Sequence, residues 1–126
     1  MTEPAFVIHG QGRPANWVVA CDHASNRVPA EDMERHIAYD IGAAGVARVL
    51  ADTLDGPAVL SNFSRLVIDP NRGEDDPTLV MKLYDGTIIP ENRRADAAEV
   101  ERRLAAYYRP YHTAIAAAMS DRPSPI

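Results

Sequence analysis

Two short polar clusters in this sequence contain the side chains best suited to chemistry. The first, Asp-His-Ala-Ser-Asn at residues 22–26, directly follows an apolar run. The second, Asp-Pro-Asn-Arg at residues 69–72, follows Arg65 and another apolar run. Imidazole and carboxylate groups are common zinc ligands, and guanidinium groups bind carboxylates in a bidentate manner. The clusters therefore raise two hypotheses, a metal site at the first and a carboxylate-binding site at the second.

Within the first cluster, His23 is the candidate metal ligand and Asp22 is the carboxylate beside it. The end of a strand holds a side chain rigidly, which suits a metal ligand. The alternative is a simple turn, in which Asp22 and Asn26 bind backbone groups and His23 faces solvent. Ser25 suggests a nucleophile activated by His23. However, the sequence has no G-x-S-x-G elbow and both residues share one loop, which argues against a serine triad.

The second cluster is suited to binding an acidic substrate. Alternation along residues 65–69 places Arg65 and Asp69 on the same face of an expected strand. Arg65 and Arg72 are candidates for gripping a carboxylate, with Asn71 beside them at the strand exit. The alternative is a structural ion pair between Arg65 and Asp69 under a loop. Both interpretations are compatible with the sequence.

The remaining candidates lie outside these clusters. Asp40 is placed to be an acid at the N-terminal end of a helix, where the helix dipole favours negative charge. As an alternative, Asp40 or His36 joins His23 around a metal. His112 lies on the last expected helix, where a packed or capping role is expected, and His9 is taken to be incidental.

The apolar spacing predicts a mixed α/β fold with a partly parallel sheet flanked by helices. The expected elements are a strand at 17–21 buried on both faces, a helix from about 37 to 54, strands at 58–61 and 65–69, and a helix from about 95 to 119 interrupted at Pro110. Residues 1–15 read as a lead-in arm and residues 70–94 as a long irregular segment. In such sheets, polar residues after the strands meet at one edge, so we expect the two clusters to share a cleft.

Composition sets limits on the partners. The chain has 126 residues, a length that favours a single domain comprising residues 1–126. Its net charge of −5 argues against nucleic acid and anionic membranes as partners. No apolar run is long enough to span a bilayer, and the N-terminus does not have the pattern of a signal peptide. With the single Cys21, these features fit the reducing cytoplasm, which is the expected location, although a secreted protein without disulfides would have the same cysteine content.

Several motifs in order resemble the N-formylglutamate amidohydrolase family. They are Val-Val-Ala-Cys-Asp-His-Ala-Ser-Asn at 18–26 with Val-Pro at 28–29, Tyr-Asp-Ile-Gly-Ala at 39–43, Ser-Arg-Leu-Val-Ile-Asp-Pro-Asn-Arg at 64–72, Asp-Gly-Thr-Ile-Ile-Pro at 85–90 and Tyr-Arg-Pro-Tyr-His at 108–112. The resemblance extends from about residue 16 to 119. It corresponds to the N-terminal half of the family, whose members continue with a further His-Ser-Phe motif.

The resemblance implies a fold and a reaction. The fold is a mixed sheet between helices similar to that of the zinc carboxypeptidases (phosphorylase/hydrolase-like), here incomplete. The reaction is metal-dependent hydrolysis of N-formyl-L-glutamate, or a related N-acyl amino acid, to formate and glutamate, as in histidine degradation, with zinc as the expected cofactor. The implied roles are metal ligation by His23, Asp22 and Asp40, catalysis by Arg65, Asp69, Asn71 and Arg72, and substrate binding by Ser25, Asn26, Arg65 and Arg72.

Two alternatives to this enzyme hypothesis are kept. The chain is a truncated and inactive module that binds small carboxylates or a partner chain, or it is a different metal-dependent amidase. An apolar surface left uncovered where the second half of the family would pack also favours a homo-oligomer.

Overall fold

A mixed, partly parallel sheet organises the chain, as the sequence predicts, and it has three strands among the described residues. The structure is a computed structural model that describes residues 4–25, 40–84 and 87–120. Strand β3 (Ala58–Ser61) lies in the centre, parallel to β2 (Val19–Cys21) and antiparallel to β1 (Phe6–His9). β3 is buried along its whole length, whereas β2 is an edge strand whose middle residue, Ala20, is exposed. The expectation that the strand within 17–21 is buried on both faces is therefore wrong.

The N-terminal segment is also more ordered than expected. Residues 6–9 form β1 rather than a loose arm, paired with β3 in the register Phe6 with Ser61 and His9 with Ala58. Phe6 and Ile8 pack against the main hydrophobic core. The glycines and proline at 10–14 mark the turn after the strand, so they did not indicate that the whole segment is irregular.

Helix α1 (Ala43–Leu54) covers one face of the sheet. It begins at Ala43, later than the predicted residue 37. The residue before it, Gly42, has a left-handed backbone with φ 83°, which is incompatible with a continuous helix through this position. Residues 37–39 lie outside the described residues. The helix ends at Leu54, followed by Asp55 and Gly56, as predicted. It packs on β2 and β3 through Ala47 and Ala51, which form a small second core with the sheet.

Residues 65–67 form a turn, so the predicted strand at 65–69 is wrong. The amide of Leu66 donates to the Ser64 hydroxyl and that of Val67 donates to the Ser64 carbonyl, which closes the turn. The outward carbonyls of Leu66 and Val67 are bound by the side chains of Asn92 and Arg103 instead of a neighbouring strand. The apolar residues 66–68 are buried, and Val67 and Ile68 pack in the main hydrophobic core instead of pairing in a sheet.

The described part of residues 70–94 is largely irregular, as predicted, and contains three short elements. They are the hairpin strands β4 (Leu83–Tyr84) and β5 (Thr87–Ile88) and the helix α2 (Pro90–Arg93). Asn92 of α2 is buried and also donates to the carbonyl of Met81. One side chain thus connects the hairpin region to the turn at 65–67.

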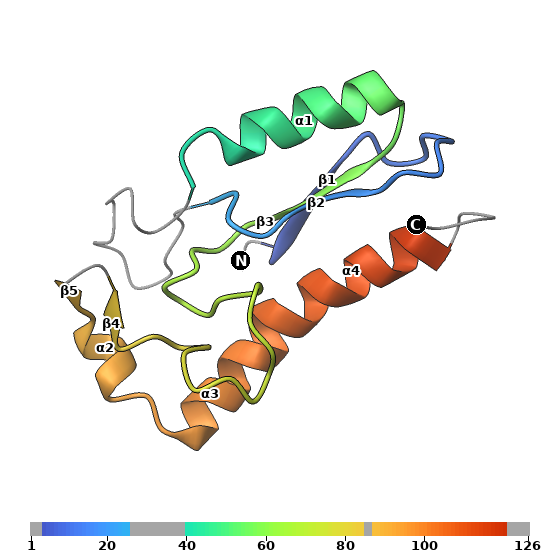
Figure 1. Ribbon diagram of the computed structural model, residues 1–126. Coiled ribbons are helices and arrows are strands. Elements are labelled where there is room, and N and C mark those ends of the chain that lie inside the picture. The colour runs from blue at the N-terminus through green and yellow to red at the C-terminus, as the bar shows by residue number, and fades with distance from the viewer. Residues whose placement is uncertain (1–3, 26–39, 85–86, 121–126) are drawn as a thin grey trace.

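The C-terminal helix covers the opposite face of the sheet from α1 (Figure 1). It consists of α3 (Ala97–Arg103), a π-helical turn η2 (Leu104–Tyr108) and α4 (Arg109–Ser120). The wide turn directly precedes Pro110, the residue expected to divide this helix, and there the Arg109 amide donates to the carbonyl of Leu104. The main core lies between this helix and the sheet, around Phe63 and Tyr111. No helix among the described residues is long and apolar enough to cross a membrane.

Candidate functional site

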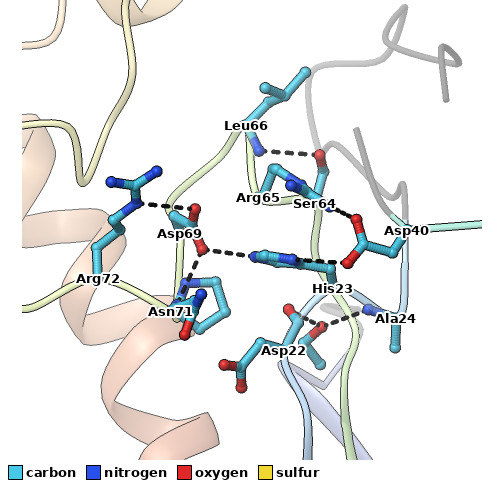
Figure 2. A network of polar contacts seen from close by, with 12 residues as sticks. Asp22, His23, Ala24, Asp40, Ser64, Arg65, Leu66, Asp69, Asn71 and Arg72 are labelled. Carbon is cyan, nitrogen blue, oxygen red and sulfur yellow. Dashed lines mark hydrogen bonds and ion pairs between the residues drawn. The ribbon is translucent and has the colours of Figure 1, made fainter. Parts of the chain in front are cut away.

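The imidazole of His23 lies between two carboxylates that come from distant parts of the chain (Figure 2). His23 follows the end of β2, and its Nε2 is 2.8 Å from Oδ1 of Asp69. Its Nδ1 is 3.3 Å from Oδ2 of Asp40, which precedes α1. The His23 side chain is 12% exposed, so both carboxylates hold a ring that is largely shielded from water.

Asp40 is held in place from two sides. Its backbone amide donates to the carbonyl of His23 at 3.1 Å, and the guanidinium of Arg65 donates to its Oδ1. The Asp40 side chain is 57% exposed, whereas that of Arg65 is 11% exposed. Arg65 therefore orients Asp40 from the protein interior, and the ion pair between Arg65 and Asp69 considered from the sequence is replaced by one between Arg65 and Asp40.

Asp69 is the buried anchor of the site, with a side chain that is 3% exposed. Besides His23, its Oδ1 accepts a hydrogen bond from the Asn71 amide at 3.0 Å, and its own amide donates to the Leu79 carbonyl. Burial acts to raise the pKa of Asp69, but the hydrogen bonds from His23 and Asn71 outweigh it and hold the pKa below its usual range. Asp69 is thus a carboxylate that accepts hydrogen bonds from its neighbours.

The loop that carries Asn71 and Arg72 is fixed by the C-terminal helix. The Tyr108 hydroxyl donates to the carbonyl of Arg72 at 2.6 Å, and Nε2 of His112 is 2.9 Å from the carbonyl oxygen of Pro70. The Arg72 side chain is 42% exposed, and its Nε is 3.6 Å from Oδ2 of Asp69. Figure 2 shows Arg72 on the far side of Asp69 from the His23 ring.

Asp22 does not join the two carboxylates around His23. Its Oδ1 accepts a hydrogen bond from the Tyr111 hydroxyl at 2.7 Å, and Figure 2 shows its carboxylate turned away from the His23 ring. Burial and the adjacent Asp22 carboxylate raise the pKa of Tyr111, so this hydroxyl stays a neutral donor. Ser61 of β3 donates to the Asp22 carbonyl and accepts from the Ala24 amide, which fixes the backbone on either side of His23.

A groove of about 540 Å³ opens beside this cluster. Its polar end is formed by Asp22, His23, Asp40 and Asn71, and its walls are formed by β2 and α1. A larger hollow of about 990 Å³ lies between the N-terminal segment and α4, and its lining contains none of the residues of the two polar clusters. The groove beside His23 is therefore the candidate site.

The other sequence candidates are distributed as follows. Ser25 is half-buried at the end of a described segment, and Asn26 and His36 lie outside the described residues. His9 pairs with Asp52 at 2.8 Å, away from the groove.

Among the described residues, one pair of potential ligand atoms is present and not a full ligand set. No three His, Cys, Asp or Glu side chains in the described part of the chain are arranged to hold a metal ion. The atoms that face each other are Nδ1 of His23 and Oδ2 of Asp40. The predicted metal ligand Asp22 is bound to Tyr111 instead.

Comparison with known proteins identifies the family. The family model for N-formylglutamate amidohydrolases matches residues 15–124, which include both polar clusters. The chain belongs to the N-formylglutamate amidohydrolase family. A search of curated proteins finds no match.

Two solved structures are similar to this member of the N-formylglutamate amidohydrolase family. One is the gene product Atu2144 from Agrobacterium tumefaciens, 29% identical with a TM-score of 0.87, for which 94% of this chain matches 51% of that chain. The other is N-formylglutamate amidohydrolase from Ralstonia eutropha JMP134, 26% identical with a TM-score of 0.70, for which 94% of this chain matches 52% of that chain. The chain thus spans about half the length of these relatives.

Several residues that support the site in this family member were missed from the sequence. Tyr108, Tyr111 and His112 each contact one of the two polar clusters, yet the tyrosines were noted only as part of the motif at 108–112 and His112 only as a packed or capping residue. Their spacing of three and four residues places them on one helical face, and this spacing was the available signal. Ser61 gave no signal, because its role depends on the parallel pairing of β2 with β3.

Proposed function

We propose that this chain carries the histidine and aspartate pair of a zinc-dependent amidase that hydrolyses N-formyl-L-glutamate, or a related N-acyl amino acid, to formate and the free amino acid. The observation that supports it is the placement of His23 between Asp40 and Asp69 at the polar end of a groove. The family match supports the amidohydrolase class, and the metal and the acyl substrate are further parts of the same proposal.

The distance between the two ligand atoms suits zinc. Zinc binds histidine nitrogen at about 2.0–2.1 Å and carboxylate oxygen at about 2.0–2.2 Å, so two such ligands of a tetrahedral ion lie about 3.4 Å apart. Nδ1 of His23 and Oδ2 of Asp40 are 3.3 Å apart. If Nε2 carries the imidazole proton, Nδ1 presents a lone pair to a carboxylate oxygen, an arrangement that a cation between them would stabilise.

Asp69 has the position of a carboxylate that orients a zinc-binding histidine. It accepts from Nε2 of His23, which leaves Nδ1 available as the ligand atom. Because Asp69 is itself held by backbone hydrogen bonds, the ring has little freedom to rotate. His23 and Asp40 would hold the metal, and a third protein ligand would come from outside the described pair.

The substrate would be bound by side chains of the loop that follows Asp69. Zinc would supply an activated water and polarise the formyl carbonyl. Asn71 lines the groove beside His23 and is placed to donate an amide hydrogen bond to the substrate. The exposed guanidinium of Arg72 is suited to a substrate carboxylate, whereas Arg65 acts by positioning Asp40.

The same proposal includes statements on the domain, the complete fold and the cellular location. Residues 1–126 are one domain equivalent to the N-terminal half of the family, the complete fold is similar to that of zinc carboxypeptidases, and the protein acts in the cytoplasm. The three-stranded mixed sheet between helices supports the second of these statements.

The test combines zinc analysis with an assay of formate. The purified chain is supplied with zinc, dialysed, analysed for metal and incubated with N-formyl-L-glutamate, and formate is measured with a coupled dehydrogenase. We expect zinc binding and formate release that His23→Ala abolishes and that His9→Ala retains, since His9 is also paired with an aspartate but lies away from the groove. Formate release without zinc, or undiminished in His23→Ala, contradicts the proposal.

A second candidate is a module that binds small carboxylates without catalysis. It is favoured by the fact that only two ligand atoms converge among the described residues, whereas a hydrolytic zinc site has three protein ligands. A chain that binds N-formyl-L-glutamate in calorimetry but releases no formate with zinc present supports this candidate and contradicts the hydrolase.

A further inference from the structure

The loop that carries Asn71 and Arg72 is bound by the C-terminal helix through the residues on either side of Asn71. Nε2 of His112 is 2.9 Å from the carbonyl oxygen of Pro70, and the Tyr108 hydroxyl donates to the carbonyl of Arg72 at 2.6 Å. A carbonyl oxygen only accepts hydrogen bonds, so Nε2 of His112 carries a proton in this contact. Two donors of one helix thus fix the backbone around Asn71.

The N–H groups of the same loop are bound as well. The Asn71 amide donates to Oδ1 of Asp69 at 3.0 Å, and the Arg72 amide donates to the carbonyl of Asp69 at 3.2 Å. Asp69 is itself anchored, because its amide donates to the carbonyl of Leu79 at 2.9 Å. The backbone of this loop therefore has little freedom to move, and side chains on a rigid backbone keep the orientation that a binding site needs.

Tyr108 and His112 are held in turn by packing. Their ring centroids are 4.5 Å apart, and Tyr108 is buried. Burial raises the pKa of Tyr108, and nearby carboxylates such as that of Glu74 raise it further, so its hydroxyl stays a neutral donor. Tyr108 also lies in the π-helical turn η2, and such turns are rare and frequently occur at functional sites.

We propose that Tyr108 and His112 are positioning residues that set the affinity of the candidate site for the substrate carboxylate. Neither lines the groove, and both act through the backbone, because holding the carbonyls of Pro70 and Arg72 fixes the direction in which the Arg72 side chain leaves the loop. A bidentate contact with a carboxylate depends on the orientation of the guanidinium plane, so a small shift of the backbone weakens it. The inference rests on the carboxylate-binding role of Arg72 in the proposed function.

The proposed zinc ligands do not depend on these two donors. The Asp40 amide donates to the carbonyl of His23, and Ser61 fixes the backbone on either side of His23. Asp69, which orients the ring, is anchored through Leu79. Loss of the Tyr108 or His112 contact should therefore change substrate affinity and leave zinc affinity unchanged, a separation that a general loss of stability would not produce.

Calorimetry tests the inference with L-glutamate, the proposed product, which carries the carboxylates and has no amide bond to hydrolyse. The chain is loaded with zinc and dialysed, and the affinities for glutamate and for zinc are measured separately. We expect Tyr108→Phe to weaken glutamate binding about three- to tenfold, the usual effect of losing one hydrogen bond. Zinc affinity should not change, and thermal unfolding checks that the variant is folded.

Two further substitutions separate the hydrogen bonds from the packing. Tyr107 lies in the same turn, but its ring packs on Phe63 with centroids 5.5 Å apart, so Tyr107→Phe is the matched control and should keep glutamate affinity. At position 112, glutamine can donate from a nitrogen placed like Nε2, whereas leucine cannot. His112→Gln should therefore keep glutamate affinity, and His112→Leu should weaken it to the same extent as Tyr108→Phe.

A double variant tests whether Tyr108 acts through Arg72. Arg72→Ala removes the guanidinium, so the addition of Tyr108→Phe should cause little further loss, because residues that act through one another are not additive. Unchanged glutamate affinity in Tyr108→Phe contradicts the proposal, as does full additivity with Arg72→Ala or equal loss in His112→Gln and His112→Leu. A native chain that does not bind glutamate also contradicts it. A chain that shows the expected binding effects but releases no formate contradicts the hydrolase and leaves the positioning role in place.

Discussion

Asp69 is the residue on which the geometry of the site depends most. It contacts His23 through one oxygen and Arg72 through the other, and it is nearly inaccessible to water. We predict that Asp69→Asn lowers zinc affinity about 10–100-fold, the usual cost of losing a partner that orients a metal-binding histidine. The affinity is measured by competition with a chromophoric chelator.

The control for this prediction is another aspartate in a turn. Asp76 accepts hydrogen bonds from the amide and hydroxyl of Thr78, and no described hydrogen bond or ion pair joins it to His23. Asp76→Asn should leave zinc affinity unchanged. Equal affinity in native protein and Asp69→Asn would show that the histidine is oriented by other contacts.

At the scale of elements, two glycines should respond to alanine with opposite changes in stability: Gly56, which follows α1 and meets the segment before β2, and Gly45 within α1. A Cβ added at Gly56 would lie 2.5 Å from the carbonyl oxygen of Trp17, whereas one added at Gly45 in α1 meets nothing within 4 Å. Gly56→Ala should destabilise the fold by about 1–3 kcal/mol because backbone must move. Gly45→Ala should stabilise it by about 0.5–1 kcal/mol through helix propensity. Urea unfolding followed by circular dichroism measures both, and the same sign for both variants rules out this interpretation.

The ion pairs of α3 give a prediction of pH dependence. Hydrogen bonds from Arg102 and Arg103 lower the pKa of Glu99 to about 2 from an ordinary 4.5. Because the folded pKa is depressed, the stabilisation is present above about pH 4.5 and is lost as the pH falls towards 2. Glu99 is near the surface, so the effect is about 0.5–1 kcal/mol.

Urea unfolding at pH 6 and at pH 3 tests this dependence. Glu99→Gln should reduce stability at pH 6 and narrow the difference between the two pH values. Glu91→Gln, on the exposed side of α2, is the control and should change neither. If Glu99→Gln loses the same free energy at both pH values, the ion pairs are not its cause.

The sequence predicted some elements well because their signals are local. The helix ending at Leu54 and the strand at 58–61 follow from apolar spacing and from the Gly-Pro stop. The turn at 65–67 could not be predicted, because it replaces strand pairing with bonds from Asn92 and Arg103 that are distant in sequence. β1 was missed for a related reason, since its partner lies about fifty residues away.

The same distinction applies to the candidate site. His23 and Asp69 were proposed because polar residues after apolar runs are visible in the sequence, and the structure brings them within 2.8 Å. The partners were harder to assign: Asp40 rather than Asp69 binds Arg65, and Tyr111 binds Asp22. Pairings of this kind depend on the three-dimensional path of the chain, which residue types alone do not determine.

At the scale of the whole molecule, zinc binding should stabilise the fold, because the two proposed ligands and the carboxylate that orients one of them come from separate segments. His23 follows β2, Asp40 precedes α1 and Asp69 follows the turn at 65–67, so unfolding separates them. A ligand at about 100 times its Kd stabilises the native state by about 2.7 kcal/mol, which raises the Tm by roughly 10 °C for a domain of this size. Calorimetry with zinc at that ratio, after the Kd is measured, tests the expectation.

The controls locate the zinc in this groove. His9→Ala should keep the shift in Tm and His23→Ala should lose it. Magnesium should shift the Tm little, because it prefers oxygen ligands. A shift of equal size in His23→Ala would place the zinc elsewhere and remove the basis for a metal site in this groove.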